Sequence, residues 1–216
     1  MMTPYQEIRA AGKAMHGKVF EVTKALDFDP IRMAKRMTLP LSGRTLIFDG
    51  EVAQNAFFDF WFHEYRVNGK SLAESVDPVA AGLKLLEAEV LTAHLQAPTS
   101  FWMTEAAEPR EHQIRLRNLL EPETPEALLT DIGLSESMHE LRVRLALFCR
   151  LVVVRGITMT SGFSFGFLPE RVPGILQAYR QKMKNVPPAD LPEARFVFFF
   201  QKHRQFGEAQ EFQDVV

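Results

Sequence analysis

The sequence has little cysteine, no long apolar run and no strong excess of either charge. Its 216 residues include one cysteine, Cys149, which excludes an intrachain disulfide and a cysteine-rich zinc site. No uncharged apolar run approaches the roughly 18 residues that a membrane helix needs. The N-terminal segment carries Glu7, Arg9 and Lys13 and lacks the apolar core of a signal peptide. These absences predict a soluble cytoplasmic protein that does not associate with a membrane.

Acidic and basic residues nearly balance, at 27 against 25, which gives a formal net charge of −2. This balance provides no general attraction to nucleic acid or to an anionic membrane. Hydrophobic residues make up 46% of the chain, so a core can form without a metal or a disulfide. The aromatic residues are uneven, with 18 Phe against 3 Tyr and 2 Trp. Because Phe has no polar group, the excess favours packing and partner surfaces over a polar catalytic cleft.

Apolar residues in the first half of the chain repeat with helical spacing. The repeat predicts a first amphipathic helix over residues 4–26. Asp29 is a suitable N-cap ahead of Pro30, so a second short helix is expected, ending before Pro40. The most aromatic segment, residues 52–65, is predicted to be a third helix.

Two more helices are expected before this spacing ends. Ser71 and Glu74 have the spacing of a capping box, which predicts the start of a short helix. Asp77 followed by Pro78 predicts the start of a long helix that runs to about residue 96.

After Pro98 the spacing changes from helical to alternating. Residues 112–117 alternate between apolar and polar, which is typical of a half-buried strand. Residues 142–155 begin in the same way and then become wholly apolar. Further short strands are expected at 101–105, 128–132, 157–160 and 163–167. Five or six short strands with glycine and proline between them predict a small antiparallel barrel or curled sheet.

Helical segments are expected again after the strands. Pro173 begins a helix to about residue 185, and a rigid proline-rich linker follows at 187–192. The phenylalanine-rich segment 195–205 is compatible with helix or strand, and helix is favoured. The conformation of 195–216 as a whole stays open.

The predicted fold class is α+β. A helical N-terminal half is expected to pack on the small antiparallel β barrel or curled sheet, with C-terminal helices closing it. The expected parts are a helical region at 1–97, a β module at 98–170 and C-terminal helices and tail at 171–216. One compact unit made of all three parts is the alternative.

Residues 57–66 read FFDFWFHEYR, and Ser71-Leu72-Ala73-Glu74 follows after a turn. This arrangement resembles a loosely defined family of uncharacterised bacterial proteins, in which an aromatic helix contains Asp-Trp-Phe and ends in Tyr-Arg. Here Phe60 separates Asp59 from Trp61, which departs from that pattern. Some relatives end in a cysteine-rich SEC-C zinc motif, which a chain with one cysteine lacks. The resemblance supports the fold and implies no reaction.

Asp59 and His63 are four residues apart on the polar stripe of the aromatic helix, so they can pair. A carboxylate that orients an imidazole is part of many general bases. No nucleophile is identifiable to complete such a site. A surface ion pair on a solvated face is the simpler interpretation.

Three polar residues fall on apolar stripes: Glu64 on the aromatic helix, and Glu87 and His94 on the long helix. We expect them to approach one another between the two helices. A polar network in the core is the first interpretation, because a buried carboxylate must be paired, neutral or at the rim. Burial of the side-chain stems with the charges at the rim, a weak metal site and an acid–base site are the alternatives. The set lacks the Glu-x-x-His pairs of di-iron bundles, so no metal or cofactor is predicted.

Arginines recur at polar positions of two predicted strands. If these two strands pair, the arginines form a positive stripe on one face of the sheet. Phenylalanines occupy alternate positions of a later strand and so lie on one of its faces. Arginine beside aromatic rings on a small barrel is how oligonucleotide-binding folds hold single strands. Solubilising arginines and core phenylalanines are the alternative, and nearby glutamates weaken the field. The arginines are Arg115, Arg117, Arg142, Arg144 and Arg150.

The sequence has no phosphate-binding loop, no Gly-x-Ser-x-Gly and no His-Glu-x-x-His motif. The expected role is therefore a non-enzymatic interaction protein that binds another protein, or itself, through phenylalanine-rich surfaces. Nucleic-acid binding through the arginine face is the second hypothesis. An uncharacterised hydrolase, built on Glu64, Glu87 and His94 or on Asp59 and His63, is the third.

Overall fold

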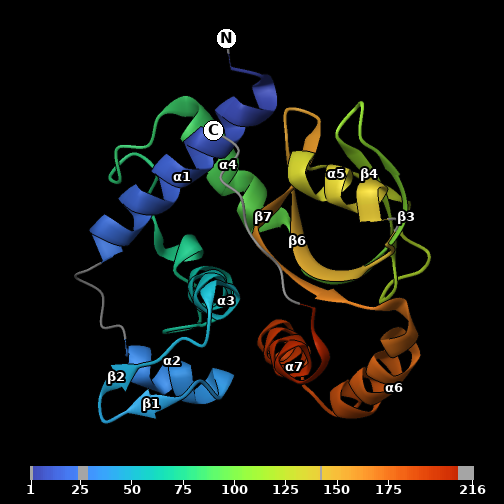
Figure 1. Ribbon diagram of the computed structural model, residues 1–216. Helices are drawn as coiled ribbons and strands as arrows, with labels where there is room; N and C mark the ends of the chain where they lie inside the picture. The colour runs from blue at the N-terminus through green and yellow to red at the C-terminus, as the bar shows by residue number, and fades with distance from the viewer. Residues whose placement is uncertain (1, 24–28, 142, 209–216) are drawn as a thin grey trace. The chain divides into compact units, whose positions relative to one another are not determined.

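The computed structural model describes residues 2–23, 29–141 and 143–208. The chain divides into two compact units, one of Met1–Ala97 with Val152–Gly156 and one of Pro98–Leu151 with Ile157–Val216. The first unit is mostly helical (Figure 1). Its elements are α1 (Pro4–Thr23), α2 (Pro30–Met37), β1 (Leu41–Ser42), β2 (Thr45–Leu46), α3 (Glu51–His63), the 3₁₀ turn η1 (Ala73–Ser75) and α4 (Leu85–Gln96).

The first three predicted helices are present. Helix α1 buries Ile8, Met15 and Val19 along one stripe, and the last predicted positions of this helix lie outside the described residues. Helix α2 begins where expected, because the Asp29 carboxylate accepts hydrogen bonds from the backbone of the first turn, at 3.0 and 3.1 Å. The aromatic segment is helix α3, as predicted.

The predicted long helix from Asp77 is wrong in its first part. Residues 77–84 form turns, and α4 begins only at Leu85. Gly82 has a φ of +62°, a left-handed conformation that ends the helical path. As a result Val79, which lies in the first turn of the predicted helix, is 87% exposed.

The second unit is built around a closed five-stranded barrel in the order β3-β4-β5-β7-β6. The predicted small barrel is confirmed, with one difference: β5 and β7 pair in parallel, while the other described pairings are antiparallel. Among the described residues, closure leaves this barrel without an exposed sheet edge. The strands are β3 (Thr99–Glu108), β4 (Gln113–Asn118), β5 (Ala127–Thr130), β6 (Ala146–Val154) and β7 (Ile157–Phe167).

Two parts of the second unit differ from the sequence prediction. The two strands expected at 157–160 and 163–167 are one strand, β7, in which Gly162 takes a φ of +116° without ending it. Helix α5 (Ile132–Leu141) was not predicted. Its signal was Asp131, whose carboxylate accepts a hydrogen bond from the Leu134 amide at 3.0 Å and caps the first turn.

The chain ends in the 3₁₀ turn η2 (Pro169–Arg171) and helices α6 (Val172–Met183) and α7 (Leu191–Phe206). The favoured helical conformation of the last segment is therefore confirmed. Arg195 of α7 donates hydrogen bonds to the Thr99 carbonyl of β3 at 2.7 Å and to the Tyr179 hydroxyl of α6 at 3.2 Å. These bonds join both helices to the barrel. No helix in the described ranges has the length and apolar character to cross a membrane.

Nine of the 18 phenylalanines are buried in the core of the second unit. The rings of Phe148 in β6 and Phe199 in α7 stack with centroids 4.2 Å apart, and Phe165 and Phe196 pack beside them. Each such ring contributes roughly 2–3 kcal/mol by burial. The unbroken run of phenylalanines on α7 is thus covered by the barrel and by α6, which removes an aggregation-prone surface.

Candidate functional site

Two imidazoles meet in the core of the first unit. Nε2 of His63, at the end of α3, lies 3.1 Å from Nδ1 of His94 in α4, and the two rings are nearly parallel, at 6°. Both side chains are buried. Because one ring nitrogen must donate while the other accepts, this contact holds a single proton between the two rings.

The predicted approach of Asp59 to His63 is also present. Oδ1 of Asp59 lies 3.7 Å from Nε2 of His63, which is within ion-pair range and longer than a hydrogen bond. Both side chains are largely buried, so they do not form a pair on a solvated face. His94 is the nearer neighbour of this nitrogen. The carboxylate therefore acts on the imidazole through its charge more than through a direct hydrogen bond.

A third imidazole, His16 of α1, was missed by sequence reasoning. Its ring meets His94 at 5.2 Å and Phe62 at 4.7 Å between centroids, both edge to face. Burial lowers the pKa of His16 to about 4, although a hydrogen bond with the Gly12 backbone acts in the opposite direction. His16 is therefore neutral at physiological pH. Its position beside buried Met15 and one turn before Phe20 was the available signal.

Glu87 has a partner that the sequence did not indicate. Its Oε2 accepts hydrogen bonds from Lys18 Nζ at 2.6 Å and from the Lys84 amide at 2.8 Å. These two hydrogen bonds, with Lys18 the larger influence, hold the pKa of Glu87 below its usual value. Lys18 also donates to the Gly82 carbonyl at 2.9 Å. Glu87 therefore links α1 to the start of α4.

Glu64 is buried at the C-terminal end of α3, where its amide donates to the Phe60 carbonyl at 2.9 Å. The expected meeting of Glu64, Glu87 and His94 stays a prediction, since the contacts described for Glu87 go to Lys18 and Lys84. Within the described residues, no three His, Cys, Asp or Glu side chains are grouped to hold a metal ion.

The arginines of the barrel are interleaved with acids. Glu105 of β3 accepts a hydrogen bond from Arg117 Nε at 2.8 Å, and its backbone carbonyl accepts one from Arg144 at 3.1 Å. Arg115 lies 3.8 Å from Glu126. Arg150 is only 4% exposed, so it is not part of a surface stripe. Arg142 lies outside the described residues.

The phenylalanines expected to accompany the arginines lie in the core. Phe163, Phe165 and Phe167 are all buried, and Phe163 and Phe165 pack against Phe196 of α7. No stacking platform beside the arginines is formed by these three rings. The arginine-bearing strands therefore present alternating charges at their surface.

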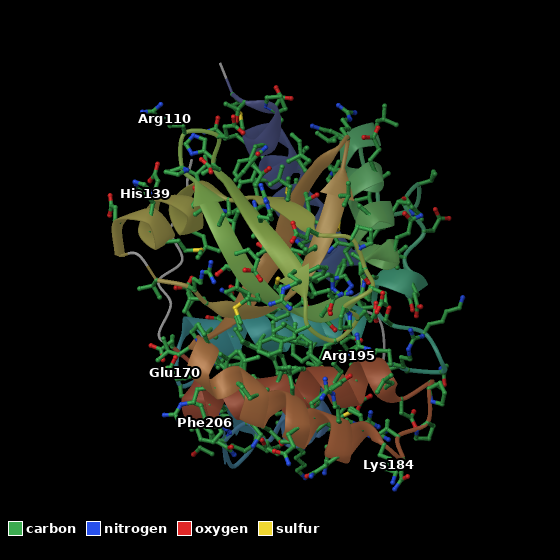
Figure 2. The ribbon with its side chains drawn as sticks, turned by 90° about the vertical axis from the view of Figure 1, so that its right-hand side faces the viewer. Arg110, His139, Glu170, Lys184, Arg195 and Phe206 are labelled. Carbon is green, nitrogen blue, oxygen red and sulfur yellow. The ribbon has the colours of Figure 1, made fainter. Side chains whose placement is uncertain are left out.

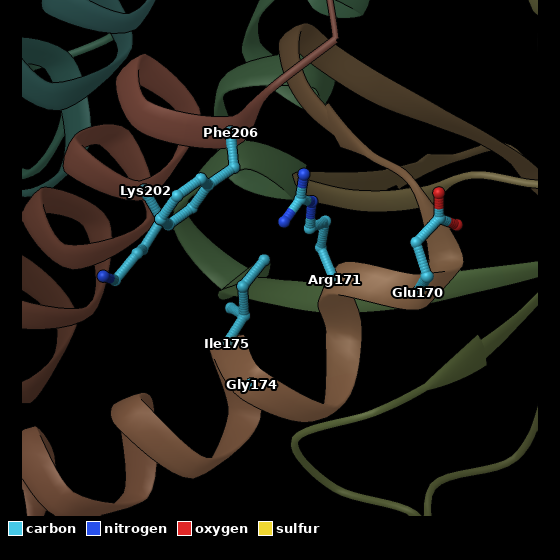
Figure 3. A pocket seen from close by; sticks show the side chains of 6 residues that line it. All are labelled: Glu170, Arg171, Gly174, Ile175, Lys202 and Phe206. Carbon is cyan, nitrogen blue, oxygen red and sulfur yellow. The ribbon is translucent and has the colours of Figure 1, made fainter.

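An open pocket of about 340 Å³ lies between η2, α6 and α7 (Figure 3). Figure 2 shows two of its residues, Glu170 and Phe206, at the same end of the helical pair, with Lys184 and Arg195 towards the other end. Phe206 is 42% exposed. The lining residues are Glu170, Arg171, Gly174, Ile175, Lys202 and Phe206.

Two cations lie against the ring of Phe206. The Arg171 guanidinium carbon is 5.7 Å from the ring centroid and Lys202 Nζ is 5.3 Å from it. Both distances fall within the range of cation–π attraction. Sequence reasoning missed this site. Lys202 and Phe206 are one helical turn apart, which was a signal, but the approach of Arg171 depends on how α6 packs against α7.

A model of a family of unknown function, DUF7986, matches residues 1–213 of the sequence. The chain belongs to this family. Comparison with curated proteins and with solved structures gave no match. The expected membership of an uncharacterised family is confirmed, and the link to relatives that carry a SEC-C motif stays a prediction.

In this DUF7986 protein two arrangements of side chains have distinct chemical capacities. The Asp59, His63 and His94 group can share and hold a proton, but its rings are buried. The pocket between α6 and α7 presents an aromatic ring and two cations to solvent. The first arrangement suits a core network, and the second suits binding of another molecule.

Proposed function

We propose that this protein is a non-enzymatic interaction protein, which binds a short segment of another protein, or of a second copy of itself, at the pocket between α6 and α7. The observation that carries the proposal is the exposed ring of Phe206, flanked by Arg171 and Lys202. Aromatic side chains and arginine are enriched in protein interfaces and dominate their binding energy.

The burial of most phenylalanines leaves few of them for the interaction surface expected from the sequence. Most phenylalanine rings of the described residues are buried in the two cores. Phe206 and Phe58, which is 37% exposed, are the phenylalanines that stand out as exposed. Phe206 borders the pocket between α6 and α7, so it is the favoured binding residue.

The two other hypotheses have weaker support. Binding of nucleic acid would need an unpaired positive stripe, whereas Arg117 and Arg144 both contact Glu105. Hydrolysis at Asp59 and His63 would need an approach for substrate, whereas these side chains are largely buried. As part of the proposal we place the protein in a bacterial cytoplasm, where Cys149, a buried thiol, stays reduced.

Selection of displayed random peptides on the immobilised protein tests the proposal. We expect enriched peptides whose binding is lost in Phe206→Ser and kept in Phe58→Ser, which removes a similarly exposed ring from the first unit. Circular dichroism and the melting temperature would establish that both variants are folded. Peptides that bind Phe206→Ser as well as the unaltered protein, or no enrichment at all, would contradict the proposal.

A further inference from the structure

We infer that the pocket between α6 and α7 recognises an extended peptide in which an acidic residue adjoins a large apolar residue. This inference rests on the proposed function and adds the chemistry of the ligand. It follows from the apolar surface of the pocket, from its uncompensated positive charge, and from the distance between the two.

The apolar part of the pocket comes from Phe206 and Ile175. Figure 3 shows the Ile175 side chain directed towards the Phe206 ring, with Gly174 beside it on α6. Gly174 has open space where a Cβ atom would lie, so no side chain of α6 fills the pocket at this position. Ile175 is buried and forms the base of the pocket, while Phe206 is 42% exposed. An aliphatic or aromatic side chain that enters here removes apolar surface of the Phe206 ring from water, which favours binding.

The charged part of the pocket favours an anion. Arg171 and Lys202 provide two positive charges, against one carboxylate from Glu170. In Figure 3, Arg171 lies between Phe206 and Glu170. No carboxylate of the described residues pairs with Arg171. Its guanidinium group, with a planar set of donors, is therefore available to hold a carboxylate through two hydrogen bonds.

The spacing of the two parts fits neighbouring residues of an extended chain. The guanidinium carbon of Arg171 lies 5.7 Å from the centre of the Phe206 ring. An extended peptide advances roughly 3.3 Å per residue, so one or two residues span this distance. When Arg171 holds the carboxylate of one peptide residue, the side chain of the next residue, or of the one after it, therefore lies against the ring of Phe206.

A peptide fits this pocket better than a nucleic-acid strand does. Single-stranded nucleic acids are held by several aromatic rings along a basic groove, with one base stacked on each ring. The pocket offers one ring and about 340 Å³, which suits one or two side chains. We therefore commit to a protein segment as the occupant.

Methyl NMR of Ile175 provides the test, with short synthetic peptides as probes. The first probe is acetyl-Ser-Asp-Phe-Ser-amide, and its matched controls carry Asn in place of Asp, or Ala in place of Phe. We expect the acidic aromatic peptide to shift the Ile175 methyl signal and to bind about tenfold more tightly than the Asn peptide at low salt, because it adds a charge-assisted bond. Added salt should reduce that difference.

Variants identify the groups responsible. Arg171→Gln should remove the preference for Asp over Asn, and Lys202→Gln should weaken it. Arg180→Gln and Lys182→Gln, on exposed positions of α6 outside the pocket, should leave the preference unchanged. Arg171 is itself exposed, so loss of folding is not expected to obscure the result.

The outcomes separate the inference from the proposal on which it rests. Equal binding of the Asp and Asn peptides, with Ile175 shifted by both, would overturn the acidic ligand and leave the interaction function standing. If none of the three peptides shifts Ile175, the acidic ligand is overturned, and the selection of displayed peptides decides whether the interaction function also fails. Tighter binding of a thymidine oligonucleotide than of any peptide would replace the protein segment with a nucleic acid.

Discussion

At the scale of single residues, His16 makes stability depend on pH. Its folded pKa of about 4 lies below the usual histidine pKa of 6.5, so the unfolded chain binds a proton more readily than the folded one. This contribution to stability is complete above about pH 6.5 and is lost as pH falls towards 4.

We predict that stability falls by about 2 kcal/mol between pH 7.5 and pH 5 because of His16. Urea unfolding at a series of pH values measures this loss, and His16→Gln should show a correspondingly shallower dependence. The other histidines titrate in both proteins, so the difference between the two curves is the relevant quantity. Parallel curves would mean that His16 is not held in the neutral form.

Single residues also show which features of the first unit's polar groups could be predicted from the sequence. The apolar stripes predicted that Glu64, Glu87 and His94 would be buried polar groups, and all three are buried. Their partners could not be predicted in the same way. Lys18 meets Glu87 across 69 positions of the chain, because the packing of α1 against α4 sets that contact. Spacing within one helix carries no information about the neighbouring helix.

At the scale of elements, the ion pair between Lys18 and Glu87 joins α1 to the first turn of α4. Lys18→Met should destabilise the protein by about 1–2 kcal/mol, because a buried carboxylate loses its cation while the partly exposed position of Lys18 reduces the cost. Chemical denaturation at pH 7 measures the effect. The lowered pKa of Glu87 implies that the pair stabilises above about pH 4.5, and that the benefit is lost as pH falls further.

Glu89→Gln is the matched control for this pair. Glu89 lies on the same helix and pairs with Arg155 at 2.8 Å, but its side chain is more exposed than that of Glu87. It should change stability less than Lys18→Met. A larger loss in Glu89→Gln would place the main electrostatic contact of α4 at its exposed face instead.

The elements themselves were predicted where local chemistry defines them. Asp29 caps the start of α2, and the helical spacing of the aromatic residues predicts α3. The prediction was wrong where the backbone conformation of one glycine decides the outcome. Gly82 lies in the turns where the sequence predicted a helix, whereas Gly162 lies inside β7 without ending it. Glycine allows both conformations, and the surrounding packing selects between them.

At the scale of the whole molecule, strand β6 belongs to both compact units. Ala146–Leu151 groups with the barrel, while the following hairpin tip, Val152–Gly156, groups with the helices. The tip turns through Arg155 and Gly156, both with positive φ, as a two-residue hairpin requires. Unfolding either unit therefore removes packing from part of the same strand ladder.

We predict from this shared strand that the protein unfolds in one cooperative transition. Each unit contains one tryptophan, Trp61 in the helical unit and Trp102 in the barrel, so replacing either with Phe leaves a reporter of the other unit. In each single-tryptophan protein, the urea midpoint reported by the tryptophan should coincide with the midpoint reported by circular dichroism. Separate midpoints, with one unit folded while the other is not, would mean that the hairpin tip detaches from the helices at little cost in free energy.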